Sequence, residues 1–210
     1  MTPYKQFAIF THQRGFTLAE ISIVLVIVGL ILGGVLNARS VIRNGQTKDI
    51  IKAVNEMSTA AQQFKDRYGL WPGDYSNAVA SIPALGCANG DGNGQVQTAA
   101  ESTCASEMLI RSGMLRGTAG SPISVRGSTT LTITAATTAL TGIAAARLPG
   151  NAANAGNLVV RIQNIDCDVA FQLDRATDDG NVDTGNFRTA TTCNGQDEAS
   201  AVANAVLKIN

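Results

Sequence analysis

Residues 14–36 read RGFTLAEISIVLVIVGLILGGVL, and this stretch decides the fold. From Phe16 to Leu36 it holds 21 residues with a single charge, Glu20. At about 1.5 Å per residue, a helix of that length spans roughly 30 Å, the thickness of the hydrocarbon core of a bilayer. The stretch therefore predicts a transmembrane helix over residues 16–36.

The charges on either side of this span predict its orientation. Lys5 and Arg14 precede it, and Arg39 and Arg43 follow it. A short basic N-terminal segment stays in the cytoplasm. We therefore expect a single-pass protein of the inner membrane, with its N-terminus in the cytoplasm and the rest of the chain in the periplasm.

Two simple explanations of the span leave features unaccounted for. A secretory signal peptide needs a small-x-small cleavage site after the apolar run, and the segment LNARSVIR at residues 36–43 does not provide one. A plain signal anchor leaves Glu20 unexplained. A carboxylate inside the bilayer costs about 2.5–3.5 kcal/mol, and such residues usually face a partner charge.

The junction Arg14-Gly15-Phe16, with Glu20 at a fixed offset before the apolar run, resembles the N-terminus of type IV prepilins and of type II secretion pseudopilins. The resemblance implies that prepilin peptidase removes residues 1–15 as a leader by cutting between Gly15 and Phe16. The same enzyme would then methylate the new amine of Phe16. It also implies filament partners, which are identical or related pilin subunits, and an inner-membrane assembly platform.

Glu20 would then have a structural role in assembly. Cleavage creates a cationic amine about one helical turn away from this carboxylate. When subunits stack with a stagger, the Glu20 carboxylate of one can neutralise the amine of the next, which cancels two charges that are costly in lipid. Glu20 would thus set the register of the filament. The competing interpretation is a tolerated carboxylate that snorkels to the interface.

A one-sided helix is predicted over residues 37–69, as a continuation of the membrane span. Apolar residues recur there at spacings of three and four, and Gly69 follows in the position of a C-cap. We expect this half of the helix to pack on a soluble head. The residues of the apolar stripe are Ile50, Val54, Met57, Ala61, Phe64 and Tyr68.

The remaining residues, 70–210, predict a periplasmic or extracellular head. Strand-like runs occur at 123–125, 129–134 and 157–165, and a helix is expected at 99–113. Residues 166–176 suit a helix or a further strand. The expected fold class is α+β and type IV pilin-like, with a long N-terminal helix packed on a small antiparallel sheet. The segments WPGD at 71–74 and NGDGNGQ at 89–95 also resemble those of a subgroup of prepilin-like proteins.

All four cysteines lie in this head, on the oxidising side of the membrane, and their even number predicts disulfides. Four cysteines allow three connectivities. We favour Cys87–Cys104 and Cys167–Cys193, because each pair closes a short local loop. A zinc site is disfavoured, since the spacings contain no CxxC and no histidine follows.

Two loops place oxygen ligands at alternate positions, as calcium prefers. One contains Asp179, Asn181 and Asp183, and the other runs from Asn89 to Asn93. Neither supplies a glutamate at the twelfth position, and turn chemistry explains the same residue types. The family resemblance favours the first loop, because some pseudopilins bind calcium in a comparable C-terminal loop. Apart from this calcium, no cofactor is expected.

Composition narrows the class of function. The 16 basic and 16 acidic residues balance, so charge does not predict nucleic-acid binding. Loss of the leader would remove Lys5, Arg14 and the sole histidine, His12. No nucleophile elbow or P-loop is present, so the sequence predicts a structural filament subunit and not an enzyme. The alternative is a membrane-anchored periplasmic binding or enzyme domain. Major pilin, minor pilin and pseudopilin are not separated at this stage.

Overall fold

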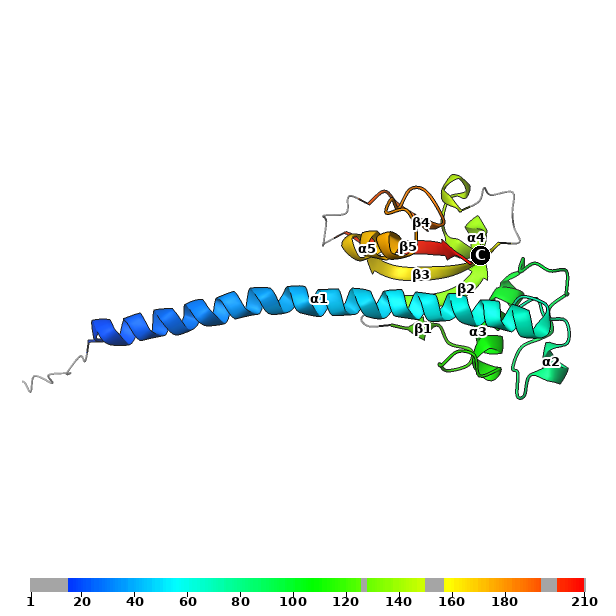
Figure 1. Cartoon of the computed structure of the whole chain (residues 1–210), viewed down its shortest axis with the longest axis horizontal. Coiled ribbons are helices and arrows are strands. Elements are labelled where there is room, and N and C mark those ends of the chain that lie inside the picture. The colour runs from blue at the N-terminus through cyan, green and yellow to red at the C-terminus, as the bar shows by residue number, and fades with distance from the viewer. Residues whose placement is uncertain (1–14, 126–127, 150–156, 194–199, 210) are drawn as a thin grey trace, which may run out of the picture. The chain divides into compact units, whose positions relative to one another are not determined.

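The computed structural model describes residues 15–125, 128–149, 157–193 and 200–209, and for residues 36–40 the backbone alone. The chain divides into two compact units, Met1–Asn44 and Gly45–Asn210. Each unit is considered by itself. Figure 1 shows the elements, which are α1 (Leu18–Tyr68), α2 (Ala78–Ser81), α3 (Ala99–Arg111), β1 (Ile123–Ser124), β2 (Thr130–Ala135), α4 (Thr138–Thr141), a 3-10 turn (Ala145–Arg147), β3 (Leu158–Asp166), α5 (Cys167–Thr177), β4 (Phe187–Thr189) and β5 (Ala201–Lys208).

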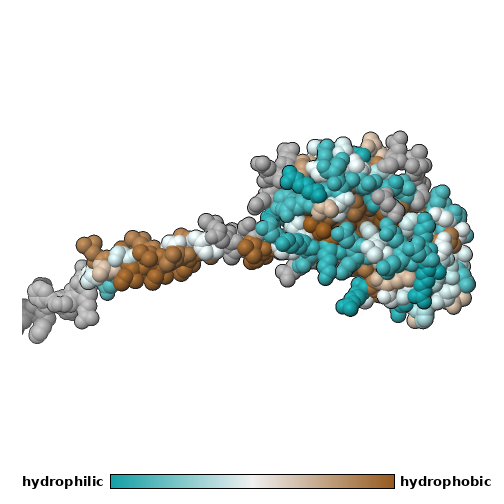
Figure 2. Space-filling view, in the orientation of Figure 1, coloured by the Kyte–Doolittle hydropathy of each residue, from teal (hydrophilic) through white to brown (hydrophobic). Residues whose placement is uncertain are grey.

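The part of α1 in the first unit is apolar on every side. Leu18–Val35 has a mean hydropathy of 2.6, and none of its residues is buried by protein. Figure 2 shows this apolar surface gathered over the helix. The helix is long and apolar enough to cross a membrane by length and composition. A surface of this size is not stable in water, so it requires lipid or the apolar surfaces of other protein chains.

The part of α1 in the second unit carries the core of the head. The predicted stripe is confirmed, because Val54, Met57, Ala61 and Phe64 are fully buried. The helix ends at Tyr68, and Gly69 follows with φ +81°, a left-handed conformation that suits glycine. Its amide donates to the carbonyl of Lys65 at 2.7 Å, which closes the last turn.

An antiparallel sheet of five strands, in the order β1-β2-β3-β5-β4, packs on this stripe. The register pairs Leu131 with Ile162 and Ile133 with Val160. Because side chains alternate across a strand, these four residues share the face that enters the main core. The opposite face carries a smaller apolar cluster formed by Ala136, Ile143, Leu148, Val159 and Val206. The α+β fold predicted from the sequence is therefore confirmed.

Two of the strands were not anticipated. β4 has three residues, and β5 has the sequence AVANAVLK, which contains three alanines and an asparagine. Such composition has a low preference for strands. β5 forms because it lies between β3 and β4, where Val202, Ala205 and Leu207 become buried. The open choice at residues 166–176 is also decided, because α5 begins at Cys167.

Two disulfides tie loops of the head to its helices. Cys87 pairs with Cys104, with a Cα–Cα distance of 5.8 Å, and Cys167 pairs with Cys193 at 5.6 Å. Both distances lie in the range that a disulfide requires. The first bond links the segment after α2 to α3, and the second links the start of α5 to the segment after β4. Each cross-link contributes about 2–4 kcal/mol to stability.

Candidate functional site

The predicted cleavage junction lies at the start of α1. Gly15 is exposed, and apart from its chain neighbours no described residue has an atom within 4 Å of the position where a side chain would begin. The neighbouring Phe16 is 84% exposed. Both residues precede the first turn of the helix at Leu18, so their backbone is not held by helical hydrogen bonds. The rest of the predicted leader, residues 1–14, lies outside the described residues.

Glu20 forms a reciprocal cap with Thr17. The Glu20 amide donates to Thr17 Oγ1 at 3.2 Å, and Glu20 Oε2 accepts from the Thr17 amide at 2.8 Å and from its hydroxyl at 2.9 Å. This is a capping box, which satisfies two of the free amides at a helix N-terminus. Thr17-x-x-Glu20 is the sequence signature of that motif, and the sequence reasoning overlooked it.

The capping box uses only one of the two carboxylate oxygens. Within the described part of the chain, both hydrogen bonds that the Glu20 carboxylate accepts are made by Oε2. Oε1 is thus available to a second cation while the first turn of α1 stays capped. The same side chain can begin the helix and face a charge on another molecule.

The residues predicted to bind calcium in the C-terminal loop each have a local partner. Asp179 accepts from the Asn181 amide at 2.9 Å and from the Thr184 hydroxyl at 2.6 Å. Asn181 accepts from the Asp183 amide at 3.2 Å. Asp183 forms an ion pair with Arg147. The alternate spacing therefore serves turns and an ion pair.

The structure brings Asp179 together with two other carboxylates. Asp174 lies near the end of α5, and Asp178 follows directly after that helix. Each of the three carboxylates offers one oxygen, and these three oxygens lie within 4.8 Å of one another. We call these three residues the α5 acidic group. Asp178 accepts from the amides of Asn186 and Phe187, the latter at 2.9 Å, so the loop leading to β4 wraps around it.

Asp174 differs from its two neighbours because it is fully buried. Among the described residues, neither of its oxygens has a hydrogen-bond partner. Burial, together with the charges of Asp179 and Asp178, raises the pKa of Asp174 to about 6, although the nearby Gly180 amide acts in the opposite direction. A buried carboxylate that lacks a partner is costly in its charged form. A bound cation would remove that cost.

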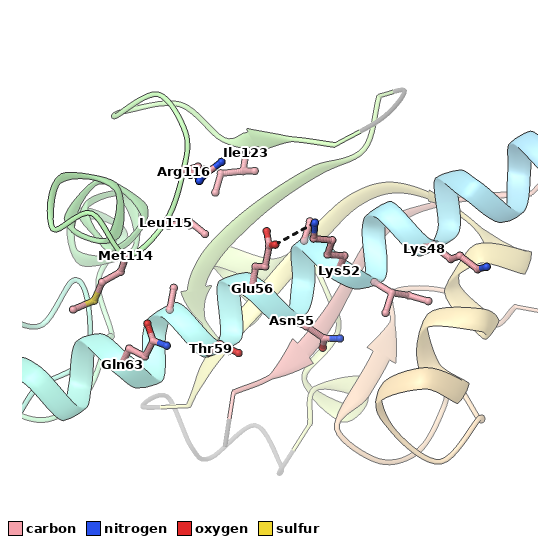
Figure 3. Close-up of a pocket in the computed structure, with 13 residues that line it drawn as sticks. Lys48, Lys52, Asn55, Glu56, Thr59, Gln63, Met114, Leu115, Arg116 and Ile123 are labelled. Carbon is pink, nitrogen blue, oxygen red and sulfur yellow. Dashed lines mark ion pairs between the residues drawn. The ribbon is translucent and has the colours of Figure 1, made fainter.

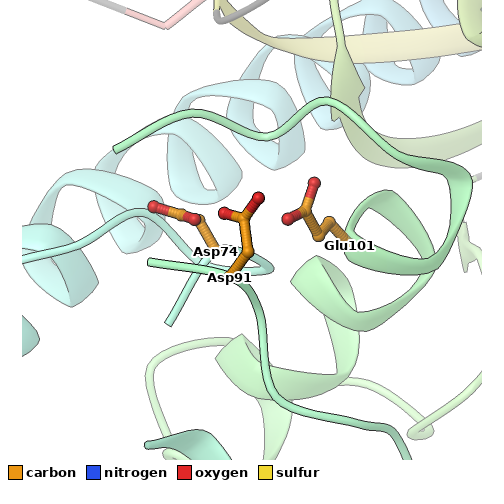
Figure 4. A group of neighbouring side chains, drawn as sticks. All are labelled: Asp74, Asp91 and Glu101. Carbon is orange, nitrogen blue, oxygen red and sulfur yellow. The ribbon is translucent and has the colours of Figure 1, made fainter. Parts of the chain in front are cut away.

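A second acidic group is formed by Asp74, Asp91 and Glu101 (Figure 4). Asp74 is fully buried and accepts from the amides of Gly92, Asn93 and Gly94 at 2.8–3.1 Å. Burial raises the pKa of Asp74, while the Gly94 and Gly92 amides oppose the rise. Backbone donors therefore already satisfy the Asp74 carboxylate, and these hydrogen bonds hold the glycine-rich loop in place.

The other two carboxylates of this group also have local partners. Glu101 accepts from the amides of Gln97 and Thr98 and so caps α3. Asp91 accepts from the Asn93 amide and side chain. Asn89, the first residue of the second predicted calcium loop, accepts from the Val79 amide. These contacts are those of a folded turn.

A groove of about 940 Å³ lies between α1 and the segment from Met114 to Ile123 (Figure 3). Its charged lining residues are exposed, and Lys52 forms an ion pair with Glu56 at 3.7 Å. Such surface pairs contribute little to stability. The groove presents a mixed polar and apolar surface along one side of the helix.

Comparison with known proteins identifies the N-terminal segment. Residues 10–36 match the family model of the prokaryotic N-terminal methylation motif. No curated protein and no solved structure matches the chain. The chain thus carries the prepilin-type cleavage and methylation segment of type IV pilin-like proteins, and the resemblance seen in the sequence is confirmed. The pilin-like α+β fold agrees with that class.

The burial of Asp174 predicts an unusual pH dependence of stability. The pKa of Asp174 in the folded chain, about 6, lies above the ordinary value of 3.8, so the folded state binds more protons between those values. Its contribution to stability is present at low pH and is lost as the pH rises through about 6. We expect Asp174→Asn to remove that loss when melting temperatures are measured in chelator from pH 4 to pH 7.

Other carboxylates also titrate in this pH range. The prediction therefore concerns the difference in melting temperature between the unaltered chain and Asp174→Asn at each pH. Asp66→Asn, at an exposed position on α1, serves as the control and should retain the pH dependence of the unaltered chain. Identical pH profiles for the unaltered chain and Asp174→Asn would contradict the prediction.

Proposed function

We propose that this protein is a structural filament subunit of the type IV pilus and type II secretion class, whether a pilin, a minor pilin or a pseudopilin. It is inserted in the inner membrane as a precursor, with its N-terminus in the cytoplasm and its head in the periplasm. Prepilin peptidase cuts after Gly15 and methylates Phe16. The mature chain then joins related subunits through its apolar helix on an inner-membrane platform.

The observation that carries this proposal is the combination of the methylation motif at residues 10–36 with an apolar helix that no protein covers. A membrane can cover such a helix before assembly, and neighbouring helices can cover it afterwards. The exposed junction at Gly15 and Phe16 is what a peptidase needs, because its active site must reach the backbone.

The geometry of Glu20 supports a role in subunit register. Cleavage would place a cationic amine on Phe16, next to the residue that caps the helix. The free oxygen of Glu20 can then face the amine of an adjacent subunit, which pairs two charges that lipid would otherwise destabilise. The protein is in this respect the substrate of an enzyme, and its own role is structural.

Processing can be tested by intact mass and N-terminal sequencing of the chain purified from native membranes. We expect a mature chain that begins at Phe16 and carries one added methyl group. Gly15→Leu should leave the leader attached, because the junction would then carry a bulky side chain. Gly29→Ala, within the apolar helix, should be processed normally. A mature chain that begins at any other residue would refute the proposal.

The role of Glu20 can be tested by two substitutions that separate charge from capping. Glu20→Gln keeps an oxygen that can accept from Thr17 but loses the charge, whereas Glu20→Ala loses both. We expect both variants to be processed and both to enter filaments at least about tenfold less efficiently, the factor produced by about 1.4 kcal/mol. Glu56→Gln is the control. Normal incorporation of Glu20→Gln would assign the role of Glu20 to capping alone.

We also propose that the α5 acidic group binds calcium. The support comes from Asp174, whose buried oxygens have no partner among the described residues, and from the convergence of Asp178 and Asp179 on it. Hard cations take carboxylate oxygens as ligands. Relative to the loop predicted from the sequence, this site keeps Asp179 and replaces Asn181 and Asp183 by Asp174 and Asp178.

Two variants distinguish this site from the one predicted by spacing. Calcium at a hundred times its dissociation constant stabilises a folded protein by about 2.7 kcal/mol, which should raise the melting temperature by several degrees. We expect Asp174→Asn to abolish that rise and Asp183→Asn to retain it. Loss of the rise in Asp183→Asn alone would favour the alternate-position site, and no rise in the unaltered chain would refute calcium binding.

A further inference from the structure

A second, smaller groove lies on the head, formed by α3, β2, the segment before β1 and one side chain of β3. Its volume is about 280 Å³. Of the residues that line it, only Arg161 is charged. Five of the other lining residues carry side-chain hydroxyl groups that could contact a ligand. They are Ser102, Ser106, Ser121, Thr132 and Thr134. We call this feature the Arg161 pocket.

Arg161 carries a charge that no described carboxylate neutralises. Its Nε and Nη2 donate to Asn204 Oδ1 at 3.0 and 2.8 Å, and within the described ranges it has no carboxylate partner. Burial lowers the pKa of Arg161, and no opposing charge offsets this effect. The guanidinium nevertheless stays protonated, because its pKa is far above neutral. A partly desolvated cation without a counter-charge favours the binding of an anion.

The orientation of Arg161 is fixed before any ligand binds. Asn204 on β5 lies beside Arg161 on β3, and both also lie close to Gly142, which ends α4 with φ +69°. A side chain at Gly142 would begin 2.8 Å from Asn204 Nδ2 and 3.9 Å from Arg161 Nη2. The glycine thus permits a close approach that holds the pair in place. Such preorganisation reduces the entropy that binding costs.

The hydroxyl groups of the pocket supply further donors. Within the described part of the head, those of Ser106, Ser121 and Thr132 form no hydrogen bond, and Ser106 is only 8% exposed. Ser102 accepts from the Thr134 hydroxyl at 3.1 Å, which leaves its own proton free to donate. A polar group as well enclosed as the Ser106 hydroxyl usually finds a partner.

We propose that the Arg161 pocket binds a small oxyanion, either a carboxylate on a small organic acid or sugar acid, or inorganic phosphate. Arg161 would supply the charge, and the hydrogens on Nη1 and Nη2 that do not go to Asn204 would donate to such groups. The serine and threonine hydroxyls would donate to the remaining oxygens. The volume lies at the small end for ligand sites and limits the ligand to about the size of one sugar ring. This site is separate from the filament role proposed for α1.

The test measures the melting temperature of the full mature chain in detergent, at constant ionic strength set with sodium chloride. Three probes are added separately at 10 mM, which are phosphate, acetate and glucuronate. A ligand at about ten times its dissociation constant stabilises by RT ln 11, which corresponds to a rise of about 3–6 °C. A rise with phosphate alone identifies an inorganic oxyanion, and a rise with acetate or glucuronate identifies a carboxylate. No rise with any probe overturns the proposal.

Three variants show whether a rise comes from this pocket. Arg161→Gln should abolish it, and so should Ser106→Leu, which fills the pocket while leaving the bonds between Arg161 and Asn204 in place. Ser106→Leu also decides the question if Arg161→Gln does not fold. Arg116→Gln, at an exposed arginine, should retain the full rise. A rise that survives in Ser106→Leu overturns the proposal, because the anion would then act elsewhere.

Discussion

The constraint on which this protein depends is the removal of one apolar helix from water. Leu18–Val35 exposes apolar side chains on every side, and no described residue of the first unit covers them. Burial of apolar surface is the main favourable term in folding and in association. Lipid or other subunits must therefore complete the structure. This single requirement would explain both the membrane stage and the filament that we propose.

Within that apolar setting, one polar side chain caps the helix and, in our proposal, also acts in assembly. Glu20 caps the first turn through Oε2, and among the described residues Oε1 accepts no hydrogen bond. A carboxylate in lipid is destabilising unless its charge is compensated. The capping bonds from Thr17 stabilise the carboxylate in the isolated chain, and the amine of a neighbour would complete its neutralisation in a filament. In this proposal the residue links the start of the helix to assembly.

Two buried carboxylates in the head have similar surroundings but differ in their hydrogen-bond partners. Asp74 and Asp174 are both fully buried, and each lies in a group of three carboxylates. Backbone amides of the glycine-rich loop satisfy Asp74, so its charge organises a turn. Asp174 has no such partner among the described residues, and Arg161 is charged without a carboxylate beside it. Unsatisfied groups of this kind point to ligands, whereas satisfied ones point to local structure.

The sequence by itself determined the features whose signals are local. The apolar span, the helical stripe that ends at Tyr68 and the strands β2 and β3 follow from periodicity and spacing, and the junction at Gly15 follows from the resemblance to prepilins. The capping box at Thr17 and Glu20 can also be recognised from its sequence signature. Only the tertiary structure decided that an alanine-rich segment becomes β5, because partners on both sides create that strand. It also decided which acids converge on Asp174 and which hydroxyls surround Arg161, since those residues come from separate elements that only the packed fold brings together.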